Sequence, residues 1–193
     1  MKTILSIVVL VVITFAACNS GSNAPSASDS TRTMPDTTTA NTTITPAKTA
    51  PSIKDIVSGY LRIKNGLAGD NGSDAASGGN AMVMAIDKMD TSSLTPVQKK
   101  TYADLADDTR ENAEHIGKNA GKIAHQREHF DVLSKDMYEL IRTFGAGQPL
   151  YLDSCPMYNN GKGATWLSEI KDIKNPYLGQ KMPTCGSVKQ ALR

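Results

Sequence analysis

The sequence carries little excess charge, with 21 lysine and arginine residues against 19 aspartate and glutamate residues in 193. A nucleic-acid surface or a polybasic membrane patch needs clustered basic charge, so this near balance argues against both. A phosphate-binding loop is also missing, because the short Gly-Lys-Gly run at residues 161–163 lacks the strand-to-helix context that such loops require. We therefore expect no nucleic-acid partner.

Cysteine is scarce as well, with only Cys18, Cys155 and Cys185 in the chain. A thiol oxidoreductase normally carries Cys-x-x-Cys, and residues 155–158 lack the second cysteine. A cysteine hydrolase needs a base such as His129 beside a recognisable nucleophile turn, and the sequence shows no such turn. We expect a protein that is not an enzyme.

Long apolar runs are absent except at the start of the chain. Residues 1–17 have one lysine, an apolar stretch and a small-residue end, the pattern of a secretory signal peptide. The small residues before Cys18 resemble a bacterial lipobox, which implies that Cys18 is acylated and anchors the protein to a membrane. The residue after Cys18 is Asn19 and not the aspartate that is associated with inner-membrane retention. We therefore expect a periplasm-facing envelope lipoprotein of the outer rather than the inner membrane.

The next part of the chain, residues 18–51, is rich in serine, threonine and proline and has almost nothing to bury. Such a composition predicts a disordered tether behind the lipidated cysteine. The remaining residues 52–193 are long enough for one folded domain.

Helical periodicity dominates residues 52–144. It predicts a first helix that ends near Gly69 and an alanine-rich second helix that Ser73 could cap. Thr95 and Gln98 form a capping-box pattern around proline at the start of a third helix, and a fourth runs to Gly145. Short turns predict an all-α fold, an antiparallel helical bundle of about four helices. Residues 145–193 predict a loop-rich C-terminal segment in which only 165–172 could form a short helix.

Two thiols and two thioethers bracket that last segment. Cys155 and Met157 lie at one end, and Met182 and Cys185 lie at the other. In an oxidising compartment two cysteines commonly form a disulfide, and methionine commonly fills a core. The same sulfur atoms are soft ligands that select Cu(I). The spacing leaves both a Cys155–Cys185 disulfide and a metal site open.

The chain has only three histidines. His125 and His129 are four residues apart on one face of the fourth predicted helix, which permits a two-histidine grip. His115 and His125 have polar neighbours and are interpreted as ordinary surface residues. His129 lies beside Phe130 at the edge of the apolar stripe, which makes it the better candidate ligand.

Eight short motifs follow one another along the second half of the chain: Gln126–Phe130, Leu133-Ser134, Leu150-Tyr151, Cys155–Met157, Gly163–Ser168, Ile173–Tyr177, Lys181-Met182 and Cys185-Gly186. Together and in this order they resemble the DUF3347 family. The resemblance spans about residues 53–188. That domain occurs in secreted lipoproteins and in periplasmic adaptor subunits of copper/silver-type heavy-metal efflux systems. The resemblance therefore implies a periplasm-side helical domain that handles copper or a related metal. The sequence shows none of the other segments of those adaptors, so we expect that it is not itself an adaptor.

The resemblance also implies a ligand set, namely His129, Cys155, Met157, Met182 and Cys185. It favours Cu(I), with zinc or silver as alternatives, and a role as a metal buffer or chaperone that meets an efflux adaptor or another envelope protein. The second hypothesis, from a different class, is a helical interaction module locked by a Cys155–Cys185 disulfide that docks on an envelope partner without metal.

Overall fold

The computed structural model describes residues 52–192. The predicted signal peptide, the predicted lipidation site Cys18 and the predicted tether all lie outside the described residues. Four long helices account for most of the described chain: α1 (Lys54–Ala68), α2 (Gly72–Asp87), α3 (Pro96–Lys118) and α4 (Ile123–Phe144). Among the described residues, no helix combines the length and the apolar character that crossing a membrane requires.

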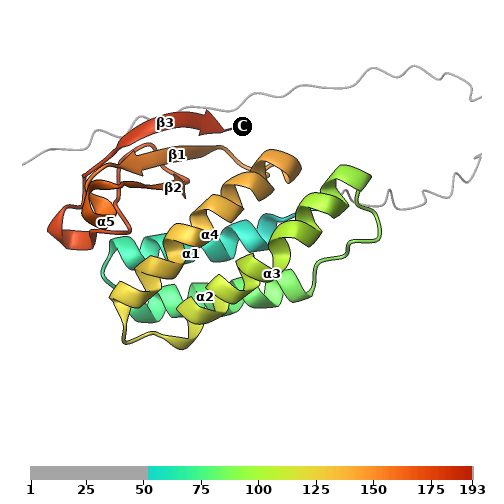
Figure 1. Cartoon of the computed structure of the whole chain (residues 1–193), viewed down its shortest axis with the longest axis horizontal. Helices are drawn as coiled ribbons and strands as arrows, with labels where there is room; N and C mark the ends of the chain where they lie inside the picture. The colour runs from blue at the N-terminus through green and yellow to red at the C-terminus, as the bar shows by residue number, and fades with distance from the viewer. Residues whose placement is uncertain (1–51, 193) are drawn as a thin grey trace, which may run out of the picture. The chain divides into compact units, whose positions relative to one another are not determined.

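The helices form an up-and-down bundle in which each one packs against the next, and α1 also contacts α4 (Figure 1). The capping box predicted at the start of α3 is confirmed, because the Thr95 hydroxyl accepts from the Gln98 N–H and the Gln98 side chain accepts from the Thr95 N–H. At α2, however, Asn71 rather than Ser73 caps the helix and accepts from the Asp74 N–H.

Glycine lets α1 and α2 approach closely. A Cβ atom added at Gly78 of α2 would lie 2.7 Å from the backbone nitrogen of Ile63 and 3.0 Å from the carbonyl oxygen of Gly59, both in α1. Gly66 of α1 is equally crowded, since a Cβ there would lie 2.5 Å from the nitrogen of Ala75. The glycines that weaken α2 as an isolated helix therefore permit its packing.

Replacing Gly78 with alanine should test this packing. Helix propensity alone would favour alanine by about 1 kcal/mol. Overpacking typically costs about 1–3 kcal/mol, and here the obstacle is backbone that cannot rotate away. We expect a net loss in the free energy of unfolding, measured by urea denaturation. Gly121→Ala, in the turn before α4, is a control for adding a methyl group without crowding, because a Cβ at Gly121 meets nothing within 4 Å. A stabilised Gly78→Ala variant would contradict the close approach.

The C-terminal segment contains a small antiparallel sheet, so the fold is mostly helical but not purely all-α. Its strands are β1 (Leu150–Cys155), β2 (Ala164–Ser168) and β3 (Ser187–Leu192), in the order β2-β1-β3. The short helices α5 (Tyr158–Gly161) and η1 (Gly179–Lys181) lie in its connections. The predicted loop and the possible helix at 165–172 were wrong here, because β1 pairs with both β2 and β3. The alternation of apolar and polar residues in β1 is weak because the charged Asp153 is buried.

Aromatic side chains fix the sheet to the bundle. The Tyr60 hydroxyl of α1 lies 2.9 Å from the Ser134 hydroxyl of α4 and accepts from the Leu167 N–H of β2 at 3.0 Å. The Tyr177 hydroxyl donates to the Thr165 carbonyl at 2.7 Å. Trp166 is fully buried between these layers. Trp166 and Tyr177 therefore anchor the C-terminal segment on the bundle.

Two charged side chains are buried where β1 and β2 meet α1. Lys64 is fully buried, and its ammonium donates to the Glu169 carboxylate at 2.8 Å. Asp153 of β1 is also fully buried, and neither of its carboxylate oxygens has a hydrogen-bond partner among the described residues. Burial raises the pKa of Asp153 to about 6, and the nearby Lys64 opposes this only in part.

A raised Asp153 pKa makes the folded protein bind more protons than the unfolded chain between about pH 4 and pH 6. Its contribution to stability is therefore greatest below pH 4 and is lost as the pH rises through 6. As the pH rises from 4 to 7, the free energy of unfolding of Asp153→Asn should increase relative to that of the wild type by up to about 3 kcal/mol. Urea denaturation of both proteins at each pH measures this difference. The difference between the two proteins cancels every other titrating group, and a difference that does not vary with pH would refute a buried, protonated Asp153.

Candidate metal centre

Three histidines meet at the end of the hairpin that α3 and α4 form. His115 lies in the last turn of α3, His125 in the first turn of α4 and His129 one turn further on. One ring nitrogen of each histidine is a possible metal ligand, and these three nitrogens all lie within 4.8 Å of one another. The rings of His115 and His129 stack with centroids 4.2 Å apart, and the His125 ring stands edge-on to His129 at 4.6 Å.

This spacing is somewhat wider than a bound ion requires. Metal–nitrogen bonds of about 2.0–2.1 Å in a tetrahedral arrangement place the nitrogens about 3.3 Å apart. The side chains of His115 and His125 are 45% and 39% exposed, so both can rotate inward without disturbing the core. The cluster is therefore a loose imidazole tripod. Closing it on an ion requires the exposed rings to rotate, because the stacked rings of His115 and His129 hold their lone pairs in nearly parallel planes.

Oxygen atoms surround the tripod. The Glu128 carboxylate lies 3.5 Å from Nδ1 of His125, and the Glu111 carboxylate lies 3.8 Å from Nε2 of His115. Asn112 Oδ1 is 2.9 Å from Nδ1 of His129. Histidines that bind metals usually have such an acceptor at the second ring nitrogen, and the two carboxylates add negative charge beside the position of a cation.

The electrostatics keep His129 neutral. Burial lowers its pKa, and the neighbouring His115 and His125 lower it further, while Glu128 and Glu111 act in the opposite direction. A metal ion binds the neutral imidazole, so a low pKa leaves a free lone pair available at neutral pH. The position and the charge environment of His129 both suit a ligand.

The sulfur residues predicted from the sequence lie elsewhere. Cys155, at the end of β1, and Cys185, before β3, form a disulfide with Cα atoms 5.7 Å apart. The disulfide alternative is thus the state that the structure contains. Met157 and Met182 are 59% and 42% exposed. Of the predicted ligand set, the structure joins the two cysteines to each other and places His129 in the histidine tripod instead.

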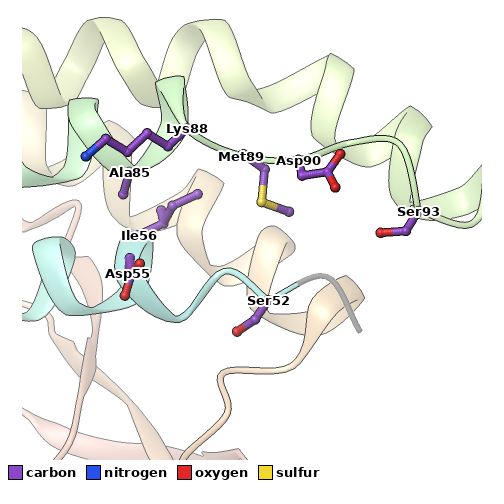
Figure 2. A pocket seen from close by; sticks show the side chains of 8 residues that line it. All are labelled: Ser52, Asp55, Ile56, Ala85, Lys88, Met89, Asp90 and Ser93. Atoms are coloured by element: carbon purple, nitrogen blue, oxygen red, sulfur yellow. The ribbon is translucent and has the colours of Figure 1, made fainter. Parts of the chain in front are cut away.

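Pockets elsewhere offer less chemistry. One of about 220 Å³ lies where the start of α1 faces the α2–α3 connection (Figure 2). Its side chains are Ser52, Asp55, Ile56, Ala85, Lys88, Met89, Asp90 and Ser93. A second, of about 710 Å³, is open between the end of α1 and residues 169–184. Neither pocket is lined by a histidine or a cysteine.

The part of the chain that matches a known family is the helical bundle that carries the histidines. Residues 56–149 match the family described as "Protein of unknown function (DUF3347)". This segment belongs to the DUF3347 family. The DUF3347 segment includes nearly all of α1 and the whole of α2, α3 and α4, with all three histidines, and ends just before β1. The motifs after residue 149, including both cysteines, lie outside the match. No curated protein and no solved structure matches the chain.

Two members of the tripod within the DUF3347 segment, His115 and His125, were not predicted as ligands from the sequence. The i, i+4 relation of His125 and His129 was recognisable there, but His115 and His125 were interpreted as ordinary surface residues. His115 lies four residues before the Asn119–Lys122 turn and His125 lies three residues after it, and an antiparallel hairpin brings such positions close together. The signal was therefore the nearly equal distance of these two histidines from the turn.

Proposed function

We propose that this protein is a metal-binding lipoprotein of the cell envelope that holds a divalent transition-metal ion at His115, His125 and His129. The observation that carries the proposal is the convergence of all three histidines of the chain on one point. Imidazole suits copper, zinc, nickel and iron, and for a given nitrogen site Cu²⁺ binds most tightly. We therefore place Cu²⁺ first and Zn²⁺ second.

A site with three protein ligands leaves one coordination position open. Here that position is at the surface, since two of the rings are more than one-third exposed. An open, accessible position permits ligand exchange with another molecule, which supports a buffer or chaperone more than a permanent structural site. An efflux adaptor or another envelope protein is the proposed recipient.

The Cys155–Cys185 disulfide bears on the compartment and on the choice of metal. Such bonds persist where the surroundings are oxidising, as in the periplasm, which supports export of the protein. The bond also occupies both thiols, so the Cu(I) site with Met157 and Met182 stays a prediction for the reduced protein only. In that state Met157→Leu and Met182→Leu should weaken Cu(I) binding without unfolding the domain. The stapled, metal-free interaction module remains the second candidate because of this disulfide.

The decisive experiment is titration of the untagged, oxidised protein with Zn²⁺ and with Cu²⁺ against a competing chelator. The proposal predicts one tightly bound ion per chain, with Cu²⁺ bound more tightly than Zn²⁺. Binding no stronger than that of free imidazole would overturn it and would favour the interaction module. Since every histidine of the chain belongs to the tripod, no other histidine can produce a false positive.

A further inference from the structure

Asn112 links the backbone of α3 to one ring of the tripod. Its Nδ2 donates to the Asp108 carbonyl oxygen at 2.8 Å, and its Oδ1 lies 2.9 Å from Nδ1 of His129. The amide therefore bridges a group that only accepts hydrogen bonds and a ring nitrogen that either donates or accepts, depending on where the ring proton lies.

The hydrogen bond to the Asp108 carbonyl determines the direction of the hydrogen bond between Asn112 and His129. A carbonyl oxygen has no proton to give, so the amide must direct its NH₂ toward Asp108 and its oxygen toward His129. An amide oxygen only accepts, so Nδ1 of His129 must carry the proton. In a neutral imidazole only one nitrogen is protonated, which leaves Nε2 with its lone pair free.

We infer that Asn112 is a positioning residue that holds His129 in its Nδ1–H tautomer and so makes Nε2 the atom that binds the metal. This inference rests on the proposed function. The hydrogen bond also limits rotation of the ring, so less freedom remains to be lost when an ion binds. Partners of this kind typically contribute a 10- to 100-fold increase in metal affinity.

Asn112→Leu and Asn112→Asp separate this role from simple packing. Leucine keeps a similar volume but accepts no hydrogen bond, so Zn²⁺ affinity should fall about 10- to 100-fold. Aspartate still accepts from Nδ1 and should retain the wild-type affinity or exceed it. Asn119→Leu is the matched control, since Asn119 donates the same kind of i−4 bond, to the His115 carbonyl at 2.8 Å. A urea midpoint for each variant shows that it folds.

The tautomer itself is measured by long-range ¹H–¹⁵N NMR of the metal-free protein, with the His115→Ala and His125→Ala variants assigning the three rings. We expect His129 to be protonated at Nδ1 in the wild type and to be a mixture of tautomers in Asn112→Leu. Protonation at Nε2 in the wild type would overturn the inference, as would equal Zn²⁺ affinity of wild type and Asn112→Leu. If the wild type binds no Zn²⁺, the proposed function fails, and with it the metal role of Asn112, whereas the NMR result still decides the tautomer.

Discussion

Replacing His129 with alanine should weaken Zn²⁺ and Cu²⁺ binding by about 100-fold or more. Loss of a partner of a ligand already costs 10- to 100-fold, and His129 would be a ligand itself. The environment of His129 also favours binding, because burial and the neighbouring rings lower its pKa and so favour the neutral imidazole. The measurement is chelator competition on the oxidised protein, with circular dichroism to confirm the helical content.

The control for this prediction is a Cys155→Ala/Cys185→Ala double variant. It removes both thiols of the soft-ligand hypothesis and leaves the tripod on α3 and α4 untouched, so divalent-metal affinity should not change. If the double variant loses the metal and His129→Ala keeps it, the site lies at the sulfur atoms and the tripod proposal is wrong. The two variants thus assign the metal to one end of the domain or the other.

The same double variant should lower the free energy of unfolding by about 3–4 kcal/mol. The disulfide closes a loop of 30 residues, and cross-linking such a loop restricts the unfolded chain by that amount on the loop-entropy estimate. For a domain of this size the loss corresponds to roughly 10 °C in melting temperature. Urea and thermal denaturation of the variant, and of the wild type with and without reductant, measure it.

Alanine is preferred to serine in this test because Cys155 is fully buried, and a hydroxyl there would add a separate cost. Reduced wild type should match the double variant. Midpoints that agree between oxidised and reduced wild type would show that the bond does not stabilise the domain. The segment from β1 to β3 would then be held by its buried aromatic side chains and by polar contacts to the bundle, such as those of Lys64 with Glu169 and of Arg127 with the Pro176 carbonyl.

The helices were predictable because each depends on local pattern. Apolar periodicity located all four, and the Thr95 capping box marked the start of α3. The sheet was not, because its residues depend on contacts far away in the sequence. Cys155 pairs with Ala164, and Ser154 pairs with both Thr165 and Ser187. The glycines Gly78 and Gly79 likewise indicate a weak helix until the neighbouring backbone is known.

The candidate site was predictable only in part, for the same reason. His125 and His129 share a helix face, which spacing alone reveals. Adding His115 requires the relative rotation of α3 and α4, which depends on how their apolar faces pack. Asn112 could not be recognised at all, since its role depends on a contact to His129 across the hairpin. The disulfide was one of two alternatives that the spacing of Cys155 and Cys185 left open.

The tripod spans only the short stretch from His115 to His129, across the four-residue turn Asn119–Lys122. Closing so small a loop costs little entropy, and hairpins of this kind form early when a chain folds. Helix ends are also the places where a folded protein opens first. An ion bound there would hold the two helices together at the turn, so a newly made chain could bind metal before its C-terminal sheet and disulfide are complete.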